Sequence, residues 1–393
     1  MRPSGSASSF PLRLLAVRVS LFTLLTCGGG PAELYASSAP ASIPPSSSTM
    51  TPPAALMPPA DHSVPSPLSA DQDTLILGAT GDIMLGSWLI DVLKEQGADY
   101  PYGEVLPILQ STDLLVGNLE SPFLSDTTGV ARAEKTYTFA VPPVIAETLT
   151  AGGFDLVGLA NNFGQSGLFE TWSVLDSLGI AHTGTGRTKV EAHQHTTIER
   201  LGRRVAFLAY SHTFPEEFWA TADRPGTAHA SDEGLAREVK RAGEDADLVV
   251  VMFHWGGELL EEPRDYQRIL AHIAVDNGAD LIIGHHPHTI QPLEWYRGRL
   301  IAYSLGNFVF GSFTSTAKGA VLLVRFTGGR TAGADLYPID VNNIRREFRP
   351  GLLDPPRWLL LESSVLAALA DSAAAGHPGV RIEEGGYFRL LPP

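Results

Sequence analysis

The chain has 393 residues, of which 44% are hydrophobic and 18% are charged, so it carries enough apolar material for one large core or two ordinary ones. Its formal net charge of −15 at pH 7 argues against a surface that binds nucleic acid or an anionic membrane, because such surfaces need clustered Lys and Arg. An anionic substrate would need a cation to recruit it to a protein of this charge.

The first 27 residues have the layout of an export signal. Three arginines precede the apolar stretch VSLFTLLTC, which is shorter than a membrane-spanning helix, and GGG follows it. Cys27, the only cysteine, stands where a bacterial lipoprotein is cleaved and lipidated, although Thr26 is an unusual residue before such a site. A lipid anchor, a cleaved soluble signal and an uncleaved anchor stay open. In each case we expect an exported protein that is membrane-anchored, periplasmic or extracellular.

Residues 28–73 are rich in Pro, Ser and Ala and carry almost no charge. This composition cannot bury enough apolar surface to offset the entropy of ordering, so it predicts a disordered linker. We expect a folded domain over residues 74–345 and a C-terminal extension over 346–393 that contains one helix, near residues 358–375.

The folded part repeats one pattern, in which a short apolar run ends abruptly in Gly, Asn, Asp or His. Continuous apolar runs predict strands that are covered on both faces, and they occupy residues 74–82, 113–120, 155–162, 204–212, 247–256, 280–288 and 300–308. Helical patterns fall between several of them, at residues 87–97, 167–179 and 263–278. This alternation predicts an α/β fold. Residues 319–326 and 334–341 have no helix between them and are expected to form a hairpin that completes a second sheet.

Polar side chains gather where these predicted strands end. They are Asp82, Asn118, Glu120, Asn161, Asn162, His254, His286 and His288. Ligands bind at the carboxyl ends of strands in open α/β sheets, and a mixture of carboxylate, amide oxygen and imidazole suits manganese, iron or zinc. Each residue alone has an ordinary structural explanation, such as a helix cap, a turn or a buried hydrogen bond. Together they predict a site for divalent metal ions.

Several motifs resemble one known family. The segments HWGGE (254–258), GADLIIGHHPHTIQ (278–291) and IAYSLGNFVF (301–310), with GDIMLG (81–86), VGNLESP (116–122) and LANN (159–162) before them, resemble the CapA proteins of poly-γ-glutamate capsule synthesis. That family is related to the calcineurin-like metallophosphoesterases. The resemblance implies two facing mixed β-sheets flanked by helices, an αββα sandwich, with a pair of metal ions at the strand ends.

The resemblance also implies a role for each residue. Asp82, Glu120 and His288 would hold one metal ion, while Glu120, Asn162, His254 and His286 would hold the other. Asp82, Glu120 and His254 are the candidate catalytic residues. In an extended segment, positions 286 and 288 would point to the same side and His285 away from it. Supporting or substrate contacts are expected from Asn118, Asn161, His212, Glu258, His285 and Asn307.

Two departures from the superfamily pattern bear on catalysis. Met84 stands where the superfamily usually carries a histidine ligand, and Phe163 stands where a histidine usually protonates the leaving group. Losing a general acid costs roughly two to four powers of ten in rate. Whether the protein is a metal-dependent hydrolase is therefore left open.

Three functions remain in competition. The first is a CapA-like role in the synthesis, export or anchoring of an anionic surface polymer, together with membrane synthesis or export proteins. The second is a metal-dependent phosphoesterase or amide hydrolase, and the third is a non-catalytic module that binds a polymer with the help of its metal. The sequence contains no G-x-S-x-G, G-x-x-x-x-G-K-[ST] or H-E-x-x-H motif, which disfavours serine-hydrolase, nucleotide-triphosphatase and zincin chemistry.

Overall fold

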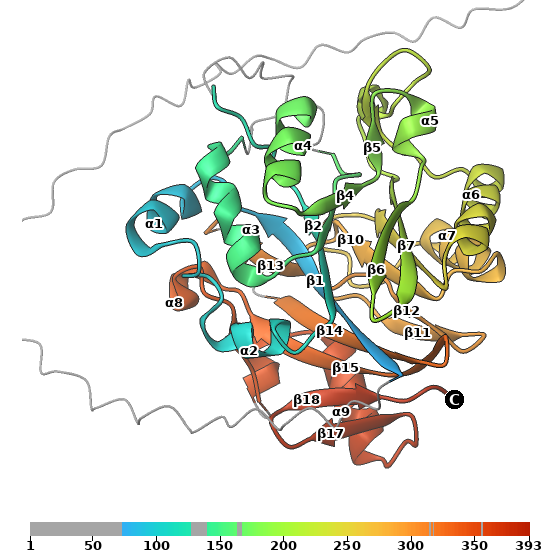
Figure 1. Ribbon diagram of the computed structural model, residues 1–393. Coiled ribbons are helices and arrows are strands. Elements are labelled where there is room, and N and C mark those ends of the chain that lie inside the picture. Colours follow the sequence, from blue (N-terminus) through green and yellow to red (C-terminus); the bar gives the residue numbers. More distant parts are fainter. Residues whose placement is uncertain (1–72, 127–139, 163–166, 314–315, 317, 355–356) are drawn as a thin grey trace, which may run out of the picture. The chain divides into compact units, whose positions relative to one another are not determined.

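The computed structural model describes residues 73–126, 140–162, 167–313, 316, 318–354 and 357–393 (Figure 1). The predicted export signal lies outside these residues, as does the predicted linker apart from Asp73. None of the helices in the described part combines the length and the apolar character that crossing a membrane requires.

The first sheet is mixed and contains most of the predicted N-terminal strands. Its order is β17 (Val380–Glu383), β18 (Tyr387–Leu390), β15 (Arg330–Asp340), β14 (Lys318–Thr327), β1 (Thr74–Met84), β2 (Leu114–Leu119), β3 (Leu156–Gly158) and β4 (Ala181–Thr183). β13 (Asn307–Phe310) pairs with β1, and β16 (Gly351–Leu352) pairs with β15. β1 to β4 run parallel, because helices connect them, whereas β14, β15, β17 and β18 are antiparallel.

The second sheet is also mixed. Its order is β11 (Leu293–Tyr296), β12 (Arg299–Ala302), β10 (Leu281–His285), β9 (Leu248–His254), β7 (Arg203–Ser211) and β6 (Thr196–Arg200). The four inner strands are parallel and almost entirely buried, as their continuous apolar runs predict, and β6 and β11 pair antiparallel at the edges. β5 (Thr185–Gly186) and β8 (Gly226–Thr227) form a separate small ribbon.

The two sheets face each other across one core. Leu77 and Val116 from the first sheet share a hydrophobic cluster with Val250 and Ile283 from the second. Helices α1 (Leu89–Gln96), α2 (Leu106–Leu109), α3 (Glu147–Gly152) and α4 (Leu168–Ser177) pack on the outer face of the first sheet. Helices α6 (Asp232–Asp245) and α7 (Asp265–Asp276) cover the outer face of the second. The prediction of two facing mixed sheets flanked by helices is therefore confirmed (Figure 1).

The remaining helices are short, except α9, which has 11 residues. They are α5 (Lys189–Ala192), α8 (Asn343–Arg346), α9 (Ser364–Ala374) and the 3-10 turns η1 (Gly103–Val105), η2 (Pro143–Ala146), η3 (Glu216–Phe218) and η4 (Arg357–Leu361). The helix expected near residues 358–375 corresponds to α9, with η4 before it.

The C-terminal half of the first sheet differs from the sequence-based expectation in two respects. β14 and β15 form the expected hairpin, but β14 pairs with β1, so the hairpin extends the sheet of β1 instead of completing the other one. After α9 the chain returns as the hairpin β17–β18, whose Phe388 is fully buried and packs on Trp358 with ring centroids 4.2 Å apart. Both outcomes depend on long-range strand pairing, which a local apolar pattern does not specify.

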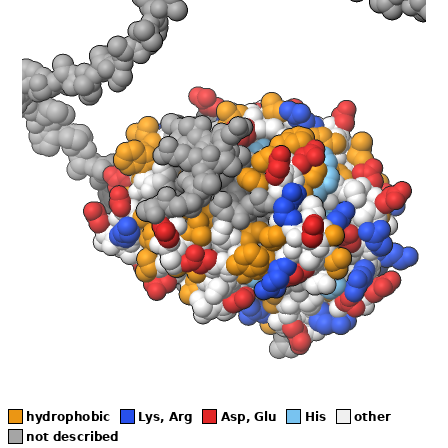
Figure 2. All heavy atoms as spheres, turned by 90° about the horizontal axis from the view of Figure 1, so that it is seen from above, with side chains coloured by type: hydrophobic (Ala, Val, Ile, Leu, Met, Phe, Trp, Pro, Cys, Tyr) orange, Lys and Arg blue, Asp and Glu red, His pale blue; other side chains and the backbone are white. Residues whose placement is uncertain are grey.

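The surface carries charges of both signs. On the described part of the face in Figure 2, acidic and basic side chains are interspersed, with hydrophobic side chains between them. The net negative charge of the chain is therefore not gathered into one acidic area on that part of the face.

Candidate metal centre

The predicted site residues meet at one edge of the two sheets. Asp82 lies near the end of β1, in register with Asn118 of β2 and Asn307 of β13. His254 is the last residue of β9, and it is in register with His285, the last residue of β10. Parallel neighbours end at the same edge of a sheet, and the facing sheets bring both edges together.

The side chain of Asn118 lies at the centre of this group. Its Nδ2 donates to Asp82 Oδ1 at 2.8 Å and to Glu120 Oε1 at 3.3 Å, and it lies 3.2 Å from His254 Nδ1. Asn161 supports it from behind, because its Nδ2 donates to Leu119 O at 2.6 Å and to Asn118 Oδ1 at 3.2 Å. Both amides therefore contact predicted ligands or the backbone beside them, where a supporting residue belongs.

His254 faces the second group of predicted ligands. Its Nε2 lies 3.1 Å from Asn162 Oδ1 and 3.8 Å from Glu120 Oε1, and its ring centroid is 4.7 Å from that of His286. Burial, together with the charge of His286, holds the pKa of His254 well below its usual value. A neutral imidazole of this kind is the form that binds a metal ion.

His288 lies close to the buried carboxylates. Its Nδ1 is 3.2 Å from Asp82 Oδ2 and 2.9 Å from Asn307 Oδ1. Burial alone would lower the pKa of His288, but the charge of Glu120 and the hydrogen bond to Asp82 raise it to about 10. Burial alone would raise the pKa of Asp82, and the hydrogen bond and charge of His288 instead hold it well below its usual value.

The backbone at the paired histidines is not extended, contrary to the prediction from the sequence. β10 ends at His285, and His286 and His288 have φ values of 93° and 53°. Such left-handed conformations cost a non-glycine residue on the order of 1–3 kcal/mol. The two imidazoles therefore converge because the chain turns, and not because they alternate along a strand. His285 Nε2 lies 3.1 Å from Thr80 O, against the backbone of β1.

Glu120 provides the test of whether a cation fits here. Its Oε2 is buried and has no hydrogen-bond partner among the residues that the structure describes. Burial and the nearby charge of Asp82 raise the pKa of the Glu120 carboxyl well above its usual value. A buried carboxylate oxygen without a donor is costly, and a divalent cation would satisfy it. Oxygen and imidazole donors together fit a metal of the manganese, iron or zinc kind.

Two groups of side chains are close enough to coordinate an ion. In each, the potential ligand atoms all lie within 4.8 Å of one another, and the groups are Asp82–Glu120–His288 and Glu258–His286–His288. All six side chains predicted as ligands thus join one contact network. Met84 does not take part, because its buried sulfur accepts from Gly86 N at 3.2 Å. Phe163 lies outside the described residues.

A pocket of about 530 Å³ opens beside this network. Asn162, Glu258 and His286 line it on the side of the predicted ligands. The predicted contact residue His212 lines it as well, with its ring centroid 4.6 Å from that of Tyr266. Arg264 also lines the pocket. The sequence pattern gives no sign of Arg264 and Tyr266 as site residues, because they look like the start of the helix α7 and no local pattern tells which way that start faces.

Comparisons with known proteins agree with the motifs. The family model described as "Bacterial capsule synthesis protein PGA_cap" matches residues 76–312. Capsule biosynthesis protein CapA of Bacillus anthracis is 31% identical over 281 residues, which cover 69% of this chain and 68% of that protein. PGA biosynthesis protein CapA of Bacillus subtilis (strain 168) is 32% identical over 276 residues, which cover 69% and 72%.

Similarity to solved structures is weaker. The NAD nucleotidase NadN of Haemophilus influenzae aligns with a TM-score of 0.40 and 12% identity, over 76% of this chain and 62% of that chain. A likeness at this level does not extend to activity.

Proposed function

Because the chain belongs to the bacterial capsule synthesis protein family, we propose that it is an exported metal-binding protein that acts on an anionic surface polymer such as poly-γ-glutamate. Membership in this family supports a role in capsule or polyglutamate synthesis. The proposal adds the metal, the export and a direct contact with the polymer.

One observation carries the metal-binding part of the proposal. Two acidic side chains, Asp82 and Glu120, are buried together with imidazoles, and Glu120 Oε2 has no hydrogen-bond donor among the described residues. Asp82, Glu120 and His288 would hold one ion, and Glu120, Asn162, His254 and His286 would hold a second. A bound divalent cation would supply Lewis acidity and an activated water. Asn118 would keep both carboxylates oriented toward the ions.

The position of Arg264 is evidence that the pocket binds a substrate that carries carboxylates. It lines the pocket next to the predicted ligands, and its guanidinium forms no ion pair with a carboxylate in the described part of the chain. An acidic protein needs such a cation to hold an anionic polymer, and a guanidinium binds a carboxylate through two parallel hydrogen bonds.

The direct test of the function is deletion of the gene from its source organism. We expect surface polymer, measured as glutamate released by acid hydrolysis of polymer that has been extracted from the cell surface and freed of protein, to be lost and to return with the intact gene. Unchanged polymer in the deletion strain would contradict the proposal.

Replacing Arg264 tests the contact with the polymer. Arg264→Gln should weaken the binding of poly-γ-glutamate roughly 10- to 100-fold, because a charge-assisted hydrogen bond is worth about 1.5–3 kcal/mol. The measurement is fluorescence anisotropy with a labelled oligomer. Arg241→Gln is the matched control, since Arg241 is an exposed arginine that lines a different pocket. Equal losses in both variants would assign the effect to overall charge.

Metal uptake should release protons. His288 has a pKa of about 10 and is protonated at pH 7, and a cation can bind it only after that proton leaves. We therefore expect the affinity for Zn²⁺ to rise between about pH 6 and pH 9, with at least one proton released per protein at pH 7. Calorimetric titrations in buffers of different ionisation enthalpy measure this number. His288→Gln should reduce it, and an uptake without proton release would refute the assignment.

A hydrolase remains the second candidate, because the set of potential metal ligands is nearly complete. Phe163→His would restore an imidazole at the position where the superfamily carries its general acid. If only that acid is missing, hydrolysis of an unactivated phosphodiester should rise by about 10²–10⁴, while an aryl ester with a good leaving group should gain little. An unchanged rate on the unactivated ester would leave the polymer-binding module as the better explanation.

A further inference from the structure

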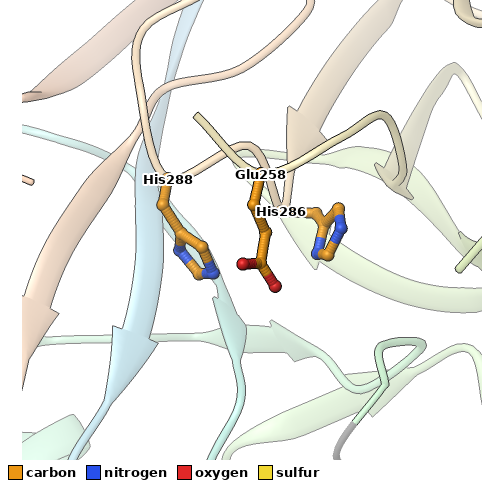
Figure 3. A group of neighbouring side chains, drawn as sticks. All are labelled: Glu258, His286 and His288. Carbon is orange, nitrogen blue, oxygen red and sulfur yellow. The ribbon is translucent and has the colours of Figure 1, made fainter. Parts of the chain in front are cut away.

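We propose that Glu258 is itself a ligand of the metal centre, bound from the loop that follows β9. This inference rests on the metal-binding function proposed above and assigns Glu258 a closer role than the supporting or substrate contact expected from sequence. Figure 3 shows its carboxylate between the imidazoles of His286 and His288. The potential ligand atoms of these three residues lie within 4.8 Å of one another.

The number of donors leaves room for such a ligand. Asp82, Glu120 and His288 offer three ligands to one ion, whereas metals of this kind take at least four. Met84 cannot supply the missing donor, because it is buried and its sulfur accepts from Gly86 N. Glu258 approaches from a different loop and adds an oxygen beside His288, which already belongs to this group.

No contact among the described residues supports a purely structural role for Glu258. A glutamate that only stabilised its own turn would accept hydrogen bonds from backbone N–H groups, and one in a surface ion pair would lie beside Lys or Arg. Among the residues that the structure describes, the Glu258 carboxylate neither accepts a backbone hydrogen bond nor pairs with Lys or Arg. Its carboxylate nevertheless lies beside two imidazoles, and a carboxylate oxygen with two imidazole nitrogens is a donor set that suits a divalent cation.

The loop that carries Glu258 is fastened to the turn that carries the histidines. Leu259 N donates to Pro287 O at 2.8 Å, and Trp255 N donates to His285 O at 3.1 Å. At the loop's far side, Gly256 N donates to Tyr266 Oη at 2.6 Å. These hydrogen bonds hold Glu258 over the histidines before any ion arrives. Ligands preorganised in this way lose less entropy on binding.

The position of Glu258 also matters for the substrate. It is exposed and lines the pocket that Arg264 shares, so it marks the boundary between the metal centre and the polymer. A carboxylate of the polymer that enters this pocket would meet the ion at the place that Glu258 occupies.

The experiment compares the metal affinity of Glu258→Gln with that of the unchanged protein. Affinities for Zn²⁺ are measured by competition with a chromophoric chelator, and the number of bound ions by mass spectrometry of the metal content. We expect Glu258→Gln to weaken at least one site about 10-fold or more. Substitution with Co²⁺ gives a second readout, because the loss of a carboxylate ligand changes the intensity of its visible absorption. Glu258→Asp, which keeps the carboxylate, should recover part of the affinity.

Glu262→Gln is the matched control, because Glu262 lies on the same loop but pairs with Arg268 at 3.7 Å, away from the histidines. Thermal unfolding without metal should be the same for all variants, since the Glu258 carboxylate makes no contact that folding needs. If the unchanged protein binds no metal, the proposed function fails. If it binds metal and Glu258→Gln leaves affinity and Co²⁺ spectrum unaltered, only the assignment of Glu258 is overturned.

Discussion

Asp82→Asn is expected to abolish metal binding at the site formed by Asp82, Glu120 and His288. The overall affinity of the protein for metal ions should fall at least 100-fold. Asp82 Oδ1 accepts from Asn118 Nδ2 at 2.8 Å, and Oδ2 accepts from His286 N at 3.1 Å. An asparagine must point its NH₂ at one of these two donors, so the substitution removes a negative ligand and also places two donors against each other. Leaving a buried donor unsatisfied costs about 1–3 kcal/mol by itself.

The measurement is the metal content of the purified variant after dialysis against a weak chelator, together with its affinity for Zn²⁺. Asp280→Asn is the matched control. Asp280 is also buried, accepts from Val249 N at 2.9 Å and pairs with Arg299 at 3.0 Å, but it precedes β10 and so lies at the opposite end of the strand from the histidines. It should lower stability and leave metal binding intact. Full metal occupancy in Asp82→Asn would show that these side chains do not form a metal centre.

Gly284→Ala should destabilise the protein by at least about 3 kcal/mol, at the upper end of the cost of overpacking a core. A Cβ at Gly284 would lie 1.9 Å from Tyr303 O and 2.7 Å from Trp255 Nε1. It would therefore occupy the place of the buried hydrogen bond that Trp255 Nε1 donates to Tyr303 O at 2.9 Å. The backbones of β10 and of the chain after β12 must separate, and the turn that carries His286 and His288 must move with them.

Urea unfolding followed by circular dichroism measures this loss. Gly243→Ala, in the last turn of α6, is the control, because its Cβ would have only Val249 Cγ2 nearby, at 3.9 Å. It should raise stability by up to about 1 kcal/mol, the difference in helix propensity. We also expect Gly284→Ala to lose metal affinity, whereas Gly243→Ala should not. If Gly284→Ala were as stable as the unchanged protein, β10 could not be packed this closely against the chain after β12.

The positions of the main buried strands along the chain could be predicted from the sequence pattern, whereas the two facing sheets and the ligand roles of six polar side chains were implied by the family resemblance. The buried strands β1, β9 and β10 are indicated by continuous apolar runs, because a strand covered on both faces has no polar side. Asp82, Glu120, Asn162 and His254 stand where such runs stop, and parallel strands stop at a common edge. Burial and strand ends depend on the residues of a single segment, so a local pattern is enough to predict them.

Other features of the site depended on contacts between segments far apart in the chain. His286 and His288 reach the carboxylates through left-handed backbone that a local pattern would rate as unfavourable, and His286 N is held there by Asp82. Glu258 came to the histidines because its loop bonds to Pro287, and Arg264 came to the pocket because α7 begins beside that loop. Sequence by itself determined which residues are buried and where strands end, because hydrophobicity is a property of each side chain and can be read without knowing the fold. Only the tertiary structure decided where side chains point after the strands end, because hydrogen bonds between distant loops set that direction.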